Sequence, residues 1–423
     1  MTTAGTVVIV DTYMSTRRLA PEFHRAGFAT VRVQSTATPP LVYSAGHVTE
    51  DFIDNIVHLG DLAETLRAVA KHEPVAVLAA GELGVELADR LSEELGLPTN
   101  GTALSPARRD KHVQIETVRR AGLRAARQLL VTNEAELASW HREIGGRVVV
   151  KPLRSAAGDG VAFCDEPAAA LAAYRAILTK ETIFGGANGA AVAQEYLFGG
   201  EYVVNTVSRD GRHQVTDIWK YTKVDTNGVR DLIAGAYLLP RHGEVQDQLV
   251  PYAFEVLDAL GIRHGPGHFE IKLTPDGPCL VEVGARLSGL DKPYYARVGT
   301  GQSQLDWVVD AYARPERFHE QVGQSYRIHS HVGIATLAAP FEGTLAGYPL
   351  LPVVEQLESH HDTRLLVPVG GRLRRTVDDM TWPVTIGLAH PVPDVLLRDL
   401  NTIKYLDGPG FYRLAEPTPG HAS

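Results

Sequence analysis

The sequence predicts an α/β domain followed by regions of α+β structure, because three patterns succeed one another along its 423 residues. About the first hundred residues alternate apolar strand-like runs with helical patterns, which is typical of a parallel sheet with helical crossovers. The middle holds short strands, hairpin turns and helices, and roughly the last ninety residues hold short strands broken by Gly and Pro. A chain of this length is too long to fold around one hydrophobic core of ordinary size. We therefore expect four parts, at residues 1–104, 105–190, 191–328 and 329–423.

The first part is expected to be Rossmann-like. TVVIVD precedes a helical pattern over 15–26 and the strand ATVRVQ, and PVAVLAA precedes GELGVELADRLSEELG. No GxGxxG follows the first strand, whose exit reads DTYMSTRR, so we do not expect a nucleotide site there. The carboxyl ends of these strands can still hold a small substrate, because open parallel sheets bind ligands at that edge.

The later parts have recognisable helix starts and turns. A helix is expected to begin at Ser105, with that serine as N-cap and Pro106 at the first helical position. The strands VVVKP, GVAF and AAVAQEYLF follow it, and HVGIATLAAP, TRLLVPVGG and WPVTIGLAHP occur near the C-terminus. The other predicted elements are helices over 166–178, 246–261 and near 395–404, and hairpins turning at 210–211 and 275–277.

Composition and charge argue against several classes of function. The net charge is -9 at pH 7, so the chain lacks the long-range attraction for polyanions that nucleic-acid binding needs. No run of about 20 apolar residues is present, and the start MTTAGTVVIVD lacks a basic flank, so we expect a cytoplasmic protein with no membrane partner. The two cysteines, Cys164 and Cys279, are too few for a disulfide framework and are expected to be buried free thiols.

Two lysines and a glycine loop are the first candidate binding residues. Lys151 ends the apolar strand VVVKP, where an unpaired ammonium is costly, and Lys111 follows an aspartate on the predicted helix. A lone lysine is more often a solvated surface residue. The loop RSAAGDGV follows Lys151, and its glycines permit backbone amides to turn toward phosphate oxygens, although an ordinary hairpin turn is the alternative. Its candidate residues are Ser155, Gly158 and Gly160.

Two glutamates are the second set of candidates. Glu270 and Glu282 each lie on one strand of a predicted hairpin, in the apolar contexts HFEIKL and CLVEVGA. A bare carboxylate at such a position needs a cation, and hard oxygen ligands beside a triphosphate indicate Mg²⁺. A salt bridge between Glu282 and Arg286 is the structural alternative. His264 and His268 flank HGPGH, but two histidines alone do not indicate zinc.

In this order and spacing, RRDKHVQIETVRRAGL, VVVKPLRSAAGDGV, AQEYLFGGEYVV and HFEIKLTPDGPCLVEVGARLSG resemble the ATP-grasp superfamily. The resemblance implies an ATP-grasp fold in which 105–190 form the small lid subdomain, 191–328 the large subdomain with the ATP and metal site, and 329–423 a closing β-rich lobe. It also implies a reaction. ATP phosphorylates a carboxylate, and a nucleophile, usually an amine, captures the acyl phosphate with release of ADP and phosphate.

The resemblance also implies a role for each candidate residue. Lys111 and Lys151 would bind the phosphates of ATP, and Arg286 would contact the γ-phosphate or the acyl phosphate. Two Mg²⁺ ions, with Mn²⁺ as an alternative, would lie on Glu270 and Glu282. The residues implied for the nucleoside are Gln194 at the adenine amino group, the main-chain groups of Glu195 and Leu197 at the adenine edge, and Glu201 at the ribose hydroxyls.

One position departs from the family pattern. Many members have an asparagine two residues after the second glutamate as a metal ligand, and this chain has Gly284. Ligation at that place would then come from water, phosphate or another side chain.

Within the superfamily the chain looks most similar to bacterial ligases that join an amino-acid carboxylate to an amine. Biotin carboxylase is disfavoured, because its arginine loop continues into a QVEH-like sequence whereas this chain reads RLSGLDKPYY. A purine-pathway ligase, a phosphotransferase that stops at the phosphorylated product, and a non-catalytic nucleotide-binding scaffold or sensor are the alternatives. The expected partners are a small carboxylate and an amine, selected by loops over 183–190 and 225–236, and a homodimer is the default assembly.

Overall fold

The computed structural model describes residues 4–40, 43 and 48–416, and it divides into two compact units. The first unit comprises Met1–Trp219 and Leu239–Arg327, and the second comprises Lys220–Leu238 and Ile328–Ser423. The C-terminal segment of the second unit therefore begins next to residue 329, where the sequence pattern placed a boundary. The second unit also takes in 220–238, which the sequence pattern placed in the preceding part.

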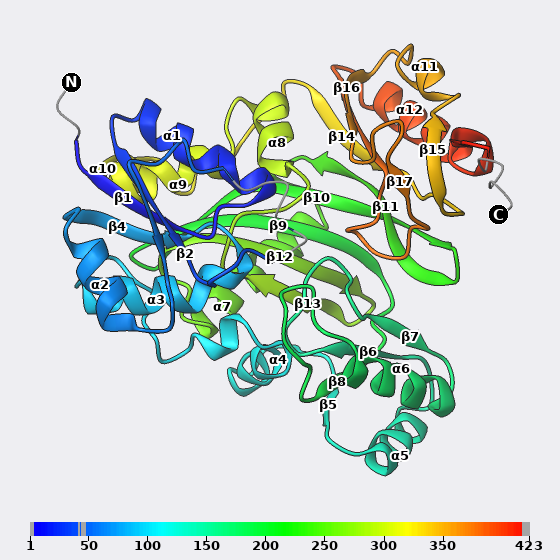
Figure 1. Cartoon of the computed structure of the whole chain (residues 1–423), viewed down its shortest axis with the longest axis horizontal. Helices are drawn as coiled ribbons and strands as arrows, with labels where there is room; N and C mark the ends of the chain where they lie inside the picture. The colour runs from blue at the N-terminus through cyan, green and yellow to red at the C-terminus, as the bar shows by residue number, and fades with distance from the viewer. Residues whose placement is uncertain (1–3, 41–42, 44–47, 417–423) are drawn as a thin grey trace, which may run out of the picture. The chain divides into compact units, whose positions relative to one another are not determined.

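The N-terminal region forms the expected parallel sheet, with the strand order β3-β2-β1-β4. Because side chains alternate along a strand, Val7 and Ile9 pack with helix α1 while Val8 and Val10 pack with α2 and α3. Figure 1 shows α1 on one side of the sheet and α2 and α3 on the other. The elements are β1 (Thr6–Val10), a 3₁₀ turn (Met14–Arg18), α1 (Leu19–Arg25), β2 (Ala29–Gln34), β3 (Asp54–Val57), α2 (Leu62–Ala70), β4 (Pro74–Ala79), a 3₁₀ turn (Glu82–Gly84) and α3 (Val85–Glu94).

The next region is a four-stranded antiparallel sheet in the order β5-β8-β6-β7, packed against α5 and α6. β8 lies between β5 and β6, so this sheet continues past the boundary predicted at residue 190. The elements are α4 (Lys111–Arg120), β5 (Gln128–Val131), α5 (Glu134–Ile144), β6 (Val148–Pro152), β7 (Ala162–Cys164), α6 (Pro167–Thr179) and β8 (Ala191–Glu195).

The helix predicted to begin at Ser105 was placed wrongly, because α4 begins at Lys111. Pro106–Arg108 forms a separate 3₁₀ turn, and the hydroxyl of Ser105 donates to Asp89 at 2.5 Å. Asp110 is the N-cap of α4, where one carboxylate oxygen accepts from the N–H groups of His112 and Val113 at 3.0 Å each. The residue that caps α4 is therefore Asp110, directly before the helix, and not Ser105.

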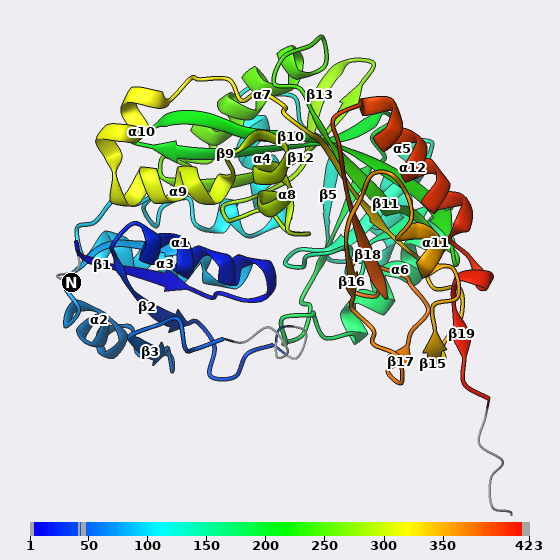
Figure 2. The same cartoon turned by 90° about the horizontal axis from the view of Figure 1, so that it is seen from above.

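The remainder of the first unit is an antiparallel sheet in the order β13-β12-β9-β10, with both predicted hairpin turns in place. Helix α7 packs on β12 and β13, while α9 packs on β9 and β12 and also contacts α1 (Figure 2). The elements are β9 (Gly200–Arg209), β10 (Arg212–Thr226), α7 (Gln246–Ala259), β12 (Gly265–Thr274), β13 (Gly277–Gly284), α8 (Lys292–Thr300), α9 (Gln304–Ala313) and α10 (Pro315–Gln321).

The second unit is rich in β structure, as the C-terminal pattern predicted. It contains the strand order β11-β14-β18-β16, covered by α12, and a small sheet in the order β17-β15-β19. The elements are β11 (Val229–Leu239), β14 (His331–Thr336), β15 (Gly343–Gly347), α11 (Leu351–Val354), β16 (His360–Leu365), β17 (Arg372–Leu373), β18 (Val384–His390), α12 (Pro393–Leu406), a 3₁₀ turn (Pro409–Phe411) and β19 (Arg413–Leu414).

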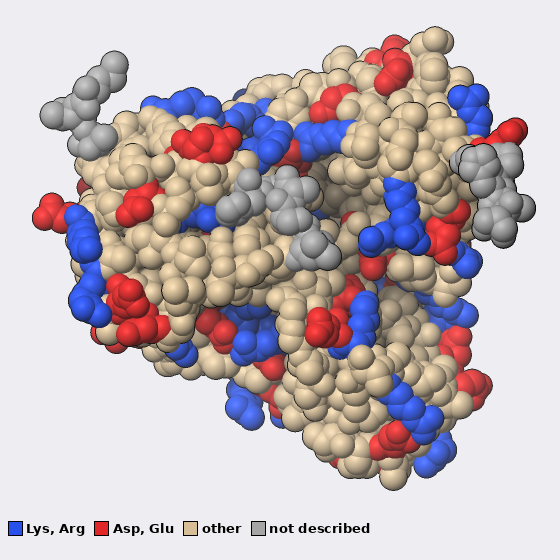
Figure 3. Space-filling view, in the orientation of Figure 1, with Lys and Arg blue, Asp and Glu red and all other residues tan. Residues whose placement is uncertain are grey.

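The surface matches the composition. On the face drawn in Figure 3, basic and acidic side chains are interspersed. Within the described residues, no helix combines the length and the apolar character that crossing a bilayer requires.

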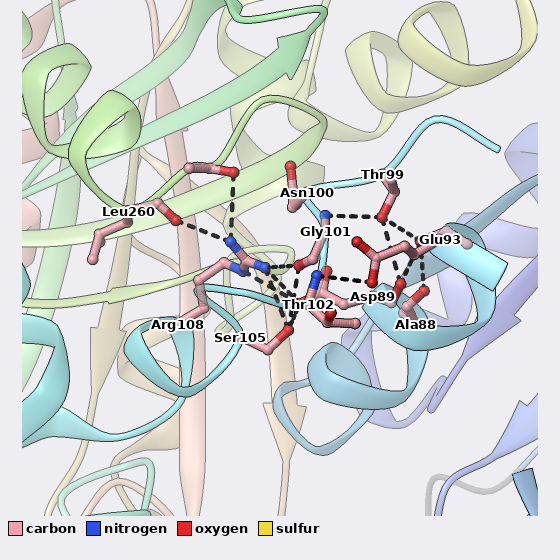
Figure 4. Close-up of polar contacts among 12 residues, drawn as sticks. Ala88, Asp89, Glu93, Thr99, Asn100, Gly101, Thr102, Ser105, Arg108 and Leu260 are labelled. Carbon is pink, nitrogen blue, oxygen red and sulfur yellow. Dashed lines mark hydrogen bonds and ion pairs between the residues drawn. The ribbon is translucent and has the colours of Figure 1, made fainter. Parts of the chain in front are cut away.

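A buried ion pair joins three segments of the first unit (Figure 4). Arg108 is fully buried, and its guanidinium donates to Asp89 Oδ2 at 2.9 Å, to the carbonyl of Leu260 at 3.0 Å and to the carbonyl of Gly101. Asp89 comes from α3, while Leu260 follows α7. Arg108 thereby ties the N-terminal sheet region to the sheet of β9, β12 and β13.

We expect Arg108→Met to lower the free energy of unfolding by about 3–5 kcal/mol, because it leaves Asp89 buried without a counter-charge. Urea unfolding followed by tryptophan fluorescence measures the loss. Arg119→Met is the matched control, since Arg119 forms an exposed pair with Glu116 and its loss should cost less than about 1 kcal/mol. The double variant Asp89→Asn, Arg108→Met should recover part of the loss, and equal effects of the two arginine variants would contradict the prediction.

Candidate active site

Glu270 and Glu282 lie directly opposite each other, as register partners on β12 and β13. Like charges at such positions repel unless a cation lies between them. Lys111 donates from Nζ to Glu282 at 2.6 Å and to the carbonyl of Ser155 at 2.9 Å. Two facing carboxylates fit Mg²⁺ that shares its coordination with phosphate, because this ion takes hard oxygen ligands and is usually held by one or two carboxylates.

Lys151 lies in the same charged cluster. It ends β6 and is 5% exposed. Burial and the positive charge of Lys111 lower its pKa to about 8, against the opposing influence of Glu282, Glu270 and Glu201. The structure therefore brings both candidate lysines and three candidate glutamates within one electrostatic neighbourhood.

The loop after Lys151 adopts the left-handed turns that its glycines suggested. Gly158 and Gly160 have φ of 75° and 72°, and Ala157 also has a positive φ of 57°. A Cβ at Gly160 would lie 2.8 Å from Pro152 Cγ, so only glycine fits there. Asp159 is 2% exposed and accepts from Lys180 Nζ at 2.5 Å. This turn therefore contains one alanine, Ala157, in the left-handed region between Lys151 and the two glycines.

Two of the residues expected to bind the nucleoside have side-chain partners at the carboxyl end of β8. Gln194 donates to the side chain of Gln128 at 3.0 Å, and the carboxylate of Glu195 accepts from Arg127 Nε at 2.8 Å. Leu197 follows the end of β8 by two residues. Both contacts involve side chains, so the contacts of the main-chain groups of Glu195 and Leu197 with adenine stay a prediction.

Glu201 has a cationic neighbour that the sequence analysis did not select. Lys272 is 7% exposed and its Nζ lies 3.9 Å from Glu201. The same ammonium lies 4.6 Å from the centre of the Tyr196 ring. Lys272 is the register partner of Glu201 across β12 and β9, and two strands far apart in sequence gave no signal of that pairing.

Glu82 and Arg109 are two further residues that the sequence analysis missed. Glu82 accepts from Arg286 Nε at 3.0 Å and pairs with Arg109. Burial opposes ionisation of Glu82, but Arg109, Arg286 and Lys111 outweigh it and lower its pKa to about 2. Glu82 follows β4, at the carboxyl edge where a substrate contact was expected.

Gly284 makes room for this arrangement. A Cβ at Gly284 would lie 3.0 Å from Glu82 Oε2 and 3.1 Å from Arg286 Nε, so a larger residue would crowd that ion pair. Where many family members have asparagine, this chain thus has a glycine that leaves room for the carboxylate of Glu82, which comes from the N-terminal sheet region.

One of the two segments expected to be specificity loops has a different structure. Residues 183–190 are largely irregular, with a single bridge between Glu181 and Ala187. Residues 225–236 are not a loop, because they form the end of β10, a turn at Asn227–Gly228 and most of β11. The many polar residues of TKVDTNGVRD suggested a loop, but this segment lies in a long hairpin formed by β10 and β11.

Comparison with known proteins gives the family. An ATP-grasp domain family matches residues 144–293. Dapdiamide A synthase of Enterobacter agglomerans is 33% identical over 331 residues, which is 77% of this chain and 77% of that protein. This chain belongs to the ATP-grasp family. It is an ATP-dependent ligase that forms an amide bond.

Solved structures agree with the fold. The L-amino acid ligase of Bacillus licheniformis has a TM-score of 0.74 at 18% identity, over 95% of this chain and 98% of that one. N5-carboxyaminoimidazole synthetase of Staphylococcus aureus, solved with ADP, has a TM-score of 0.65 at 12% identity, over 95% and 98%. The ATP-grasp architecture expected from the motifs is therefore confirmed.

The lowered pKa of Lys151 predicts a proton uptake on nucleotide binding. Its charge is present below about pH 8 and is lost as the pH rises through that value, whereas bound phosphates favour the charged form. Calorimetry of MgADP binding near pH 8, in buffers of different ionisation enthalpy, should show uptake and weakening affinity above that pH. Lys151→Met should bind more weakly and show no such uptake, and uptake retained in that variant would contradict the prediction.

The positive φ of Ala157 predicts that Ala157→Gly raises the free energy of unfolding by about 0.5–1 kcal/mol, because glycine adopts this conformation without strain. The matched control is Ala156→Gly, at a neighbouring residue whose φ is not positive, and it should lower stability by about 0.4–1 kcal/mol. Denaturant unfolding of both variants gives the comparison. The same sign of effect in both would refute a left-handed Ala157.

Proposed function

We propose that this ligase activates the carboxylate of an amino acid, or of a closely related small acid, as an acyl phosphate and joins it to the amine of a second small molecule. The observation that carries the proposal is the cluster of Lys111, Lys151, Glu270 and Glu282, which combines phosphate-binding cations with facing carboxylates. Relatives named as dapdiamide and L-amino acid ligases support amino-acid substrates.

Different residues of the site bind the phosphates, the nucleoside and the metal ions. Lys111 and Lys151 hold the phosphates of ATP, and Lys111 leaves Glu282 for this purpose. The loop of Ser155, Gly158 and Gly160 closes over the phosphates, while Gln194, Glu195, Leu197 and Glu201 hold the nucleoside. Glu270 and Glu282 hold one or two Mg²⁺ ions, which when bound neutralise charge on the phosphoryl group.

Arg286 contacts the transferring phosphoryl group and then the tetrahedral adduct formed by the amine. Its guanidinium is held by Glu82 through Nε and by the carbonyl of Leu287 through a terminal nitrogen. A preorganised cation of this kind stabilises developing negative charge without reorganisation during the reaction. No covalent enzyme nucleophile is needed, because the phosphate is the leaving group.

Three further attributes belong to this proposal. The enzyme acts in the cytoplasm, where ATP and free amino acids are available. A homodimer is its expected assembly. Its substrates are free small molecules, so no nucleic acid or membrane is a partner.

The test is incubation of the purified chain with ATP, Mg²⁺ and a matrix of amino acids, singly and in pairs, with nucleotide products and new masses followed together. ADP and phosphate that appear with one pair, and a product lighter than the pair by one water, are expected. A phosphorylated single acid as the end product would instead assign the phosphotransferase alternative. Nucleotide binding without turnover across a matrix of amino acids and other small acids would support the scaffold alternative.

Site variants locate that activity. Lys151→Ala and Glu282→Ala are each expected to lower kcat/KM by about 10²–10³, because each removes a charge that the phosphoryl transfer needs. Lys71→Ala is the control, since Lys71 is exposed at the end of α2. Near-normal turnover of a folded Lys151 or Glu282 variant would show that the site assignment is wrong.

A further inference from the structure

Arg109 has a buried N–H group without an acceptor. It lies between the 3₁₀ turn Pro106–Arg108 and α4, and it is 7% exposed. One terminal nitrogen of its guanidinium donates to Glu82. Among the residues that the structure describes, its Nε–H has no hydrogen-bond partner. Because a buried donor without an acceptor is costly, this group indicates a ligand that offers an acceptor oxygen.

The charges around Arg109 do not balance. Glu82 accepts from Arg286 as well as from Arg109. Two guanidiniums therefore share one carboxylate, which leaves a net charge of +1 on these three side chains. A buried charge is stabilised by a partner of opposite sign, and a guanidinium with free in-plane donors is suited to a carboxylate. An anionic ligand would thus satisfy both the unpaired donor and the excess charge.

The local backbone holds Arg109 beside the proposed phosphate site. Its own N–H donates to the carbonyl of Pro106 at 3.2 Å, and the next residue, Asp110, caps α4. Lys111 follows as the first residue of that helix. The positive charge of Lys111 acts on Glu82 together with the charges of the two arginines. A ligand bound to Arg109 would therefore lie close to the phosphates that Lys111 is proposed to hold.

The surroundings of Arg109 are those expected of a substrate site. Glu82 follows β4 at the carboxyl edge of the parallel sheet, where open sheets of this kind bind ligands. The Cζ atom of Arg109 lies 5.8 Å from the centre of the Phe184 ring, within the range of a cation–π contact. Phe184 belongs to the irregular segment 183–190, in which the sequence predicts a specificity loop. A ring lies over the face of a guanidinium and a carboxylate bonds in its plane, so the two contacts are compatible.

We propose that Arg109 binds the carboxylate of the amino acid that supplies the amine, and thereby directs its amino group toward the acyl phosphate. The inference rests on the proposed function and narrows the second substrate to an amine that carries a free carboxylate. In that function the activated carboxylate meets Arg286, and the phosphates of ATP meet Lys111 and Lys151. The carboxylate of the nucleophile is the remaining anion, and it stays unchanged through the reaction, so a fixed ion pair can orient it.

The decisive comparison offers each nucleophile in two forms, the free amino acid and its carboxamide. The acid, ATP and Mg²⁺ are those of the most active pair from the product matrix. The wild type should prefer the free amino acid in kcat/KM by about 10–100-fold, as a hydrogen bond to a charged group implies. Arg109→Gln should lose this preference, because the free amino acid becomes a poorer substrate while kcat/KM for the carboxamide changes less than about threefold. Arg119→Gln, in the exposed pair with Glu116, is the control and should keep the preference.

A second variant protects the test against a loss of folding. Arg109→Lys keeps a positive charge beside Glu82 but lacks the planar fork of donors, so it should restore only part of the preference. Equal losses with the free amino acid and the carboxamide in Arg109→Gln would overturn the proposal, because a purely structural role lowers both. A weaker affinity for MgADP with an unchanged preference would also overturn it, by assigning Arg109 to the phosphates.

Binding can also be followed without turnover, which separates this inference from the proposed function. The protein with MgADP is heated with each of the common amino acids or its carboxamide, and the Tm is recorded. At least one free amino acid should raise the Tm of the wild type and of Arg119→Gln, whereas its carboxamide should not, and Arg109→Gln should show no rise. Equal rises with both forms, or no rise with any amino acid, would refute binding at Arg109. If the matrix yields no amide but this rise is seen, the proposed function fails while the carboxylate site stands.

Discussion

Two carboxylates that face each other across neighbouring strands set the conditions for the rest of the site. Glu270 and Glu282 are register partners, and their repulsion must be offset by positive charge. Lys111 supplies one ammonium beside Glu282, and Lys151 supplies a second whose charge burial makes costly. A cluster of this composition is adapted to a ligand that brings anions and cations together, as a nucleoside triphosphate with Mg²⁺ does.

Gly284 links this cluster to the N-terminal sheet region. Its missing side chain leaves space for the ion pair of Glu82 with Arg286. The sheet that shows no nucleotide-binding motif therefore contributes an acidic side chain at its carboxyl edge. Glycine at this position thus leaves room for a contact between two parts of the first unit.

The parts of the fold and site that could be predicted are those with local signals. Turn residues located both hairpins, and the charge at the end of VVVKP marked Lys151 because burial of an ammonium is costly. Local patterns failed where a competing residue decided the outcome. Asp110 rather than Ser105 is the helix cap, and the segment 225–236, expected to be a loop, forms part of a hairpin.

The sequence by itself indicated the family, the fold class and part of the order of elements, because motifs, periodicity and turn residues are local signals. Only the tertiary structure decided which charges meet. Glu82 reaches Arg286 from the N-terminal sheet, Lys272 lies beside Glu201 on the neighbouring strand, and Asn205 links Asp217 to His268 by hydrogen bonds. These pairings depend on strand register and on packing between distant segments, and neither leaves a periodic or compositional trace in one sequence.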